Sequence, residues 1–312
     1  MLGTLAAWTM RRPSHQTLIF HRVVREPDPM SPSEPTAAWF ESLIAMLKRR
    51  FDLIGVAEAV RRAQEGLLNG RTLSITFDDG YADNFEVALP ILKQHGAPAT
   101  FFVASGFLDG GRMWNDSIIE TCRRLPPGRH ETGDPENGPV TLDDWESRRA
   151  AASRLITAWK HLSPDQRQRR VDGFAALADR LPDDLMMTTE QLRRMASTPG
   201  ITIGGHTVSH PILAALAPGE ARDEIEGGKH ALEEKLQIEL DLFAYPNGKH
   251  GADYLNEHAE MVRDVGFRAA VATNWGRLTS ASDVFRIPRF TPWHADLDRF
   301  CVDLARCHFG LL

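Results

Sequence analysis

The sequence predicts an α/β protein built on a parallel β-sheet, either open or closed into a barrel. Two observations support this fold class. Apolar runs of strand length alternate with segments of helical periodicity over most of the 312 residues. Hydrophobic residues make up 42% of the chain, which is enough apolar material for a large core. No internal repeat or clean linker divides the sequence, so we expect residues 1–312 to form a single domain.

The expected elements follow one another in the order that a parallel sheet requires. Runs rich in β-branched and aromatic residues predict strands at residues 17–23, 72–80, 99–105, 201–206, 241–246, 267–273 and 284–290. Apolar residues spaced three and four apart predict helices at residues 39–50, 84–95, 189–196, 218–236 and 252–265.

A different pattern interrupts this alternation after Phe107. Residues 126–139 are rich in proline and glycine and predict a loop. Residues 141–181 are rich in arginine and alanine, with apolar residues at helical spacing. We therefore expect a mostly helical insertion over residues 108–184, and nothing in it has the spacing of a catalytic motif.

The charge and cysteine content exclude some classes of protein. The chain has 36 lysine and arginine residues against 42 acidic ones, a net charge of -6, so we expect no nucleic-acid partner. Cys122, Cys301 and Cys307 contain no C-x-x-C pair and are an odd number, which argues against a disulfide framework. These features suit a small, weakly charged substrate and a reducing compartment.

The N-terminal region does not have the pattern of a secretory signal. Arg11 and Arg12 follow the apolar residues, whereas a signal peptide places its positive charge first. No stretch approaches the ~20 apolar residues that span a bilayer. We expect a cytoplasmic location, with a short helix at residues 2–10 lying on a membrane surface as the alternative.

Two acidic residues stand where the strand predicted at residues 72–80 runs into a polar turn. Parallel α/β folds place their sites at the carboxyl ends of strands, so Asp78 and Asp79 are candidates for a site. One carboxylate can bind a cation while the other acts as a base. Asp and Gly are also common turn residues, and by itself the run Asp-Asp-Gly favours a solvated turn.

Two histidines lie at the end of the strand predicted at residues 201–206 and just beyond it. His206 and His210 are four apart and can chelate one metal ion, and Gly204 and Gly205 let the backbone pass close to a ligand. A lone pair of histidines is often structural. With an acidic pair at another strand end, however, a functional site becomes the favoured interpretation of the two clusters.

The segments TFDDG (76–80) and HTVSH (206–210) resemble the first two motifs of the polysaccharide deacetylases, carbohydrate esterase family 4. The resemblance runs from about residue 21 to residue 293, without the insertion, and includes features of the exopolysaccharide-modifying branch. It implies a distorted (β/α) barrel of about seven strands. It also implies hydrolysis of the N-acetyl group of an amino sugar and one divalent metal ion.

The resemblance assigns roles to four residues. Asp79, His206 and His210 become the metal ligands, and Asp78 becomes the general base that deprotonates water at the metal. Zinc fits a shell of two imidazoles and one carboxylate, and cobalt, nickel or manganese can also occupy it.

The third family motif maps onto residues 243–248, where the N–H of Asn247 becomes the candidate oxyanion donor. The family arginine that orients the base is replaced by Ala244. Arg289 or Arg286 could restore that charge from a neighbouring strand end, and we favour Arg289.

The last family motif, a Leu-x-His pattern, has no match. His294 and His21 are the candidates for the acid that protonates the leaving amine. Trp114, Trp275 and Trp293 could stack on a sugar ring, although core packing is the commoner role of a tryptophan.

The sequence therefore predicts a metal-dependent N-deacetylase acting on a polysaccharide or a lipid-linked glycan, with a role in exopolysaccharide biosynthesis. Two alternatives stay open: a hydrolase of another amide or cyclic ureide on the same barrel, and a catalytically inactive barrel that binds glycan. The presence of Asp78 together with all three ligands speaks against the inactive barrel, because a pure binder has no use for a base.

Overall fold

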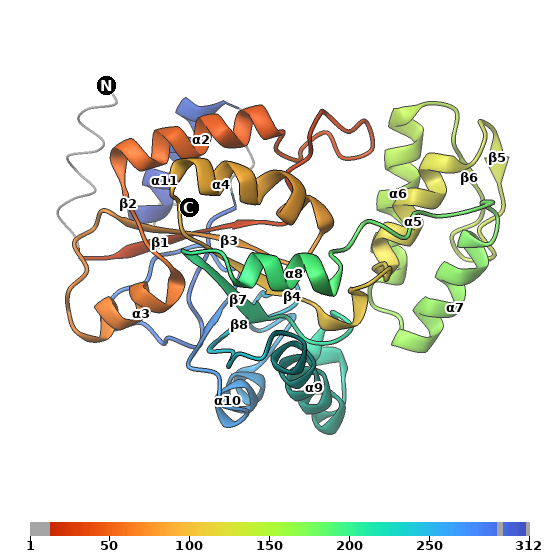
Figure 1. The fold of residues 1–312 in the computed structure, drawn as a ribbon. Helices are drawn as coiled ribbons and strands as arrows, with labels where there is room; N and C mark the ends of the chain where they lie inside the picture. Colours follow the sequence, from red (N-terminus) through yellow and green to blue (C-terminus); the bar gives the residue numbers. More distant parts are fainter. Residues whose placement is uncertain (1–12, 292–295, 310–312) are drawn as a thin grey trace.

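The computed structural model describes residues 13–291 and 296–309 of the chain. Within them, seven strands form one parallel sheet (Figure 1). The strands are β1 (His15–Phe20), β2 (Asp52–Leu53), β3 (Thr72–Phe77), β4 (Ala99–Val103), β7 (Ile201–Gly205), β8 (Leu242–Ala244) and β9 (Ala269–Val271). Their order is β1-β3-β4-β7-β8-β9, and β2 pairs with the first two residues of β3. This confirms the predicted α/β fold with a parallel sheet.

An irregular segment joins the two edges of this sheet. The N–H of Ile287 donates to Ala270 on β9, and the N–H of Phe290 donates to Thr17 on β1. Residues 284–290 make these contacts as isolated bridges, so the strand predicted there is wrong. Pro288 has no N–H and cannot continue a regular ladder. The bridges curl the sheet into a distorted barrel.

Helices cover the outer face of the sheet (Figure 1). They are α2 (Ala37–Arg50), α3 (Val56–Gln64), α4 (Leu89–His95), α8 (Thr189–Ala196), α9 (Pro218–Leu236), α10 (Asn256–Asp264) and α11 (Leu297–Phe309). The main hydrophobic core lies between these helices and the strands, where Phe77 of β3 stacks on Phe101 of β4 with ring centroids 4.7 Å apart. Short helical turns lie at Asn84–Ala88, Ser105–Phe107 and Leu213–Ala215.

The helix predicted over residues 84–95 divides into two parts. Asn84–Ala88 forms a π-helical turn and α4 begins only at Leu89. Pro90 lies in the first turn of α4 and has no N–H to bond back to the preceding turn. The wider π turn accommodates that missing donor.

The insertion forms a separate helical lobe beside the barrel (Figure 1). Its helices are α5 (Trp114–Arg124), α6 (Trp145–Trp159) and α7 (Pro164–Ala175). They enclose their own hydrophobic cluster around Ile118, Leu155, Trp159 and Phe174. The predicted loop at residues 126–139 contains one strand of a small hairpin, β5 (Arg129–His130) paired with β6 (Val140–Thr141).

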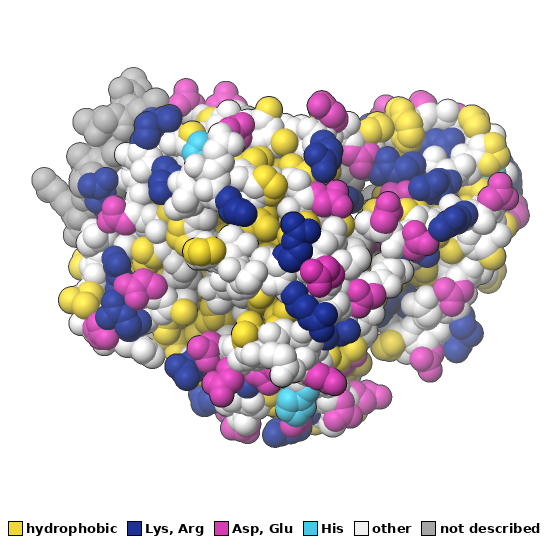
Figure 2. Space-filling view, in the orientation of Figure 1, with side chains coloured by type: hydrophobic (Ala, Val, Ile, Leu, Met, Phe, Trp, Pro, Cys, Tyr) yellow, Lys and Arg dark blue, Asp and Glu magenta, His cyan; other side chains and the backbone are white. Residues whose placement is uncertain are grey.

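The surface shows no extended field of one charge on the face drawn in Figure 2, where basic and acidic side chains are interspersed. No helix among the described residues is long and apolar enough to cross a lipid bilayer. The helix expected at residues 2–10 lies outside the described part of the chain. Cys122, Cys301 and Cys307 are all free thiols.

Candidate metal centre

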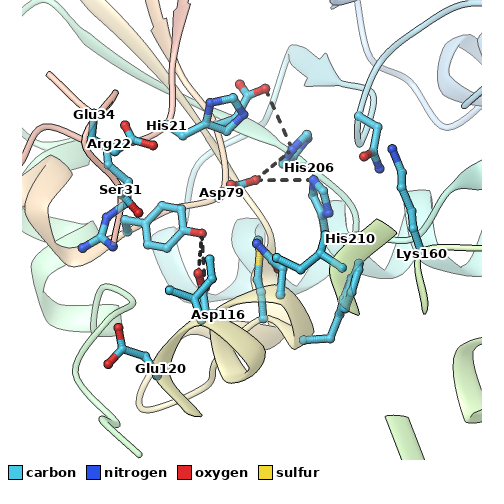
Figure 3. A pocket seen from close by; sticks show the side chains of 18 of the residues that line it. His21, Arg22, Ser31, Glu34, Asp79, Asp116, Glu120, Lys160, His206 and His210 are labelled. Atoms are coloured by element: carbon cyan, nitrogen blue, oxygen red, sulfur yellow. Dashed lines mark hydrogen bonds and ion pairs between the residues drawn. The ribbon is translucent and has the colours of Figure 1, made fainter. Parts of the chain in front are cut away.

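The carboxyl ends of five strands meet at one cavity of about 320 Å³ (Figure 3). Residues within three positions of the strand ends line it, because parallel strands all end at the same edge of the sheet. They are His21 after β1, Asp78 after β3, His206 after β7, Asn247 after β8 and Thr273 after β9. The cavity thus lies where the fold class places a site.

Three side chains converge in this cavity in positions that suit the binding of one cation. Asp79 Oδ1 lies 3.4 Å from Nε2 of His206 and 3.4 Å from Nε2 of His210. The three ligand atoms all lie within 4.8 Å of one another. Asp79 Oδ1 is buried and accepts no hydrogen bond from the described residues. A buried carboxylate oxygen with no donor, facing two imidazole nitrogens, is the arrangement that a divalent metal ion satisfies.

A hydrogen bond fixes which nitrogen of His206 faces the cluster. Its Nδ1 lies 2.7 Å from the carbonyl oxygen of Ala244 on β8. A carbonyl only accepts, so Nδ1 carries a hydrogen, and Nε2 is the nitrogen that faces Asp79. This bond between neighbouring strands orients the ring before any ligand binds.

The backbone around the cluster adopts a conformation that is rare outside glycine. Asp79, Thr207, His210 and Asn247 have φ angles of 77°, 65°, 54° and 58°. Such left-handed residues are strained and cluster at functional sites. The Thr207 loop is also tightly packed, because a Cβ on Gly228 of α9 would lie 2.6 Å from its backbone. Helix α9 therefore fixes the loop that carries both histidines.

The protonation states of His210 and Asp79 suit cation binding. Burial is the main cause that lowers the pKa of His210 to about 4, so this imidazole is neutral at neutral pH. Burial disfavours the charge on Asp79, but the neighbouring histidines outweigh it and hold the pKa of Asp79 below its usual value. A neutral imidazole and an ionised carboxylate are the forms that bind metals.

Asp78 lies beside the cluster of Asp79, His206 and His210. It is paired with Arg289. Its Oδ1 and Oδ2 each accept a hydrogen bond of 2.7 Å from Arg289, whose Nε donates to the carbonyl of Ala272. Burial opposes the ionisation of Asp78, but the charge of Arg289 outweighs it and lowers the pKa of Asp78. Asp78 is thus an ionised carboxylate about 4.0 Å from His206 Nε2.

Asn247 offers a backbone donor to the same cavity. Its carbonyl accepts a hydrogen bond from Thr273 Oγ1 at 2.7 Å, which holds the turn after Pro246 in place. The N–H of Asn247 donates to no acceptor among the residues that the structure describes. An unused backbone N–H at the cavity can donate to an oxyanion.

The remaining predicted residues divide between the cavity and other places. His21 and Trp114 line the cavity. Arg286 does not line it and instead bonds to Asn256 on α10. Trp275 is 45% exposed and packs against a barrel phenylalanine. His294 and Trp293 lie outside the described residues.

Apart from Trp114, the sequence pattern missed the wall that the insertion contributes. Lys160, Arg167, Ile119 and Ile156 come from the lobe and line the cavity opposite the strand ends. None of them stands at a strand end or at the spacing of a known catalytic motif, so periodicity alone could not find them. Only the packing of the lobe on the barrel brings them to the site.

A buried polar pair joins the lobe to the barrel at this wall. The hydroxyl of Tyr81 lies 3.1 Å from each carboxylate oxygen of Asp116 on α5 (Figure 3). Burial is the main cause that raises the pKa of Asp116 to about 7. The guanidinium of Arg22 lies over the Tyr81 ring, 4.8 Å from its centroid.

Comparison with known proteins identifies the family of this chain. The polysaccharide deacetylase family model matches residues 66–133 and 155–270, more than half of the chain. YxkH of Bacillus subtilis, which is assigned to that family, is 22% identical over 215 residues, covering 69% of this chain and 49% of YxkH. The chain thus spans about half the length of this curated relative.

Solved structures share the fold. The Streptococcus pyogenes deacetylase PplD in complex with acetate has a TM-score of 0.60 and 18% identity, covering 89% of this chain and 92% of PplD. IcaB from Ammonifex degensii has a TM-score of 0.58 and 18% identity, covering 95% and 97%. The BpsB deacetylase domain of Bordetella bronchiseptica has a TM-score of 0.57 and 15% identity, covering 89% and 96%. At these identities the likeness shows a common fold.

Proposed function

The chain belongs to the polysaccharide deacetylase family, and from this premise we propose that it hydrolyses the N-acetyl amide of an amino sugar. The products are acetate and a free amine. One observation carries the proposal: the ligand atoms of Asp79, His206 and His210 converge within 4.8 Å in the cavity that also holds Asp78. Such a cluster beside an ionised carboxylate suits metal-assisted hydrolysis.

In this proposal Asp79, His206 and His210 hold one divalent cation. Zinc suits two imidazoles and a carboxylate, and cobalt, nickel or manganese can use the same donors. When bound, the cation supplies positive charge that polarises a carbonyl group and acidifies water.

The other residues of the site move or stabilise charge. Asp78 accepts the proton of the attacking water. Arg289 keeps the Asp78 carboxylate ionised and oriented. The N–H of Asn247 donates to the acetyl oxygen as negative charge develops there. The C–N bond then breaks and the amine takes a proton. His21 and His294 are the two candidates for that acid, and His21 is the one described in the cavity.

The proposed substrate is an N-acetylated polysaccharide or lipid-linked glycan, modified during exopolysaccharide biosynthesis. A cytoplasmic location, with the chain also able to touch a membrane surface, belongs to the same proposal. The two alternative readings, another amide substrate and an inactive binding barrel, gain no observation of their own. The buried Asp78–Arg289 pair favours a catalytic site, because both residues are desolvated at a cost that binding alone does not require.

The test is acetate release from N-acetylglucosamine oligomers, with metal quantified on the same protein sample. We expect acetate in proportion to bound metal and none after chelation. Bound metal without acetate from any acetylated sugar would favour a different amide substrate. Absence of both metal and acetate would favour the inactive barrel.

A further inference from the structure

The helical lobe contributes a second wall to the cavity. Lys160 directly follows α6, and Arg167 lies one turn into α7. Both line the cavity that contains Asp79, His206 and His210. Figure 3 shows the Lys160 side chain directed into the cavity on the side where His210 lies. A ligand filling this cavity therefore touches the strand ends and the lobe together.

The other cations of the cavity already have partners. Arg22 Nε lies 2.7 Å from a carboxylate oxygen of Asp83. Arg123 pairs with Asp28 at 2.7 Å and with Glu120 at 2.9 Å. Their charges are neutralised within the protein and are not available to a ligand.

Lys160 and Arg167 differ from these residues. Neither forms an ion pair with any residue in the described part of the chain. Burial lowers the pKa of the half-buried Arg167, and no carboxylate counteracts it. A desolvated cation without a counter-ion costs free energy, which an anionic ligand recovers.

The structure also holds Arg167 in place. Its guanidinium lies over the ring of Trp114, 5.0 Å from the centroid. Its Nη1 donates to the carbonyl oxygen of Lys160 at 3.4 Å. These contacts orient the planar group, and they leave its other N–H donors for a ligand.

We propose that Lys160 and Arg167 form a subsite for a phosphate group on the acetylated sugar. This inference rests on the proposed deacetylase function. Two unpaired cations match a phosphate, which carries about -1.5 to -2 charges near neutral pH, whereas a carboxylate would neutralise only one of them. Arginine binds phosphate oxygens in a fork, and lysine adds a point charge. The acetamide then lies at the Asp79 cluster and the phosphate at the lobe.

The two carboxylates of the lobe that line this wall already have partners within the protein. Their repulsion of an anionic ligand is therefore reduced. Asp116 is bonded to the hydroxyl of Tyr81. Glu120 forms an ion pair with Arg123. Both lie on α5, whereas the two free cations come from α6 and α7.

The first test is binding, measured by calorimetry on protein stripped of metal by chelation so that phosphate cannot bind a metal ion. N-acetylglucosamine 1-phosphate is the probe and N-acetylglucosamine is the neutral control ligand. Lys160→Gln with Arg167→Gln should weaken binding of the probe at least about tenfold, the usual worth of a hydrogen bond to a charged group. Arg169→Gln, an exposed change on the same helix, should leave binding unaltered.

Equal binding of the probe and the neutral sugar by wild-type protein would overturn the subsite. So would equal weakening by Arg169→Gln. Thermal unfolding of each variant shows whether it is folded, and the two single variants give separate readings if the double variant unfolds.

The second test is kinetic and separates this inference from the proposed function. The ratio of kcat/KM for phosphorylated over neutral acetylated sugars should fall at least about tenfold in the double variant. Turnover of neutral oligomers with no preference for phosphate would overturn the subsite and leave the deacetylase proposal standing. Phosphate-dependent binding without acetate from any sugar would overturn the deacetylase proposal alone.

The same assay identifies the source of the phosphate. A nucleoside-diphosphate-linked N-acetyl sugar and a prenyl-diphosphate-linked one are compared at equal concentration. Preference for the first supports the subsite with a water-soluble carrier, and preference for the second supports it with a lipid carrier. Slower turnover of both than of the neutral sugar would overturn the subsite.

Discussion

Arg289 binds both carboxylate oxygens of Asp78, with Nη1 and Nη2 each 2.7 Å from an oxygen, across 211 positions of the sequence. Both side chains are buried. Ala244 stands where the resemblance to the family leads one to expect an arginine, so the charge comes from the segment that closes the barrel. The carbonyl of Ala244 meanwhile orients His206. Alanine at position 244 is thus compatible with the pairing of Asp78 to an arginine and with the orientation of His206.

Removing this cation should impair both stability and activity. Arg289→Met leaves the Asp78 carboxylate buried without a counter-ion, and we expect a loss of about 3–5 kcal/mol in the free energy of unfolding. Acetate release should fall by about 10²-fold, because the base loses its orientation and charge. Urea unfolding and acetate assays measure the two effects.

A second substitution serves as the control. Adding Asp78→Asn to Arg289→Met removes the stranded charge and should recover part of the stability while activity stays lost. If Arg289→Met alone unfolds at the wild-type free energy, the pair is not the buried ion pair described here.

The packing of α9 on the histidine loop gives a second prediction. Gly228→Ala would place a Cβ 2.6 Å from the Thr207 backbone, so the loop must shift. We expect a loss of about 1–3 kcal/mol in stability, together with weaker metal binding. Gly219→Ala in the same helix meets nothing within 4 Å and should be neutral or stabilising by up to ~1 kcal/mol. Equal effects of the two changes would contradict the close contact.

The core of the lobe should carry a pH-dependent part of the stability. Burial opposes ionisation of Asp134, but hydrogen bonds from Trp159 and Asn137 outweigh it and lower the pKa of Asp134 to about 2. A pKa below the unfolded value of about 3.9 means that this stabilisation is complete above pH ~4 and is lost as the pH falls toward 2.

Asp134→Asn should therefore be less stable than the wild type at pH 7, with the difference shrinking between pH 4 and pH 2. Urea unfolding at pH 7, 4 and 2.5 measures it. Asp143→Asn, an exposed acid of the same lobe, is the matched control and should follow the wild type. A difference between Asp134→Asn and the wild type that is constant with pH would show that the carboxylate charge plays no part.

Removal of metal should lower the unfolding temperature. A ligand that binds only the folded state adds about 4 kcal/mol when its free concentration is a thousand times Kd. Calorimetry before and after chelation measures the shift. His206→Ala should abolish the shift, whereas His250→Ala, a change at a histidine outside the cavity, should retain it. An unchanged shift in His206→Ala would place the metal elsewhere.

Much of the fold was predictable because the sheet is parallel and buried. The strand predicted at residues 72–80 is β3, and the helix predicted at residues 218–236 is α9 with the same bounds. The elements β2, α3 and α11 were not predicted. Proline altered two of the predicted elements by removing a backbone donor. Pro90 divides one helix, and Pro288 reduces the last strand to isolated bridges.

The site was predictable only where strand ends supplied it. Asp78 and His206 directly follow β3 and β7, so the fold class itself places them together. Lys160 and Arg167 reach the cavity through the tertiary packing of the lobe, which no local spacing encodes. The tautomer of His206 likewise depends on a carbonyl of a neighbouring strand.

The most direct test of the account compares Asp78→Asn with Asp79→Asn, measuring bound metal and acetate release on the same samples. We predict that Asp78→Asn binds metal like the wild type and releases no acetate, because only the base is lost. Asp79→Asn should lose both metal and acetate. Loss of metal in Asp78→Asn, or full acetate release from it, would contradict the division of roles between the two carboxylates.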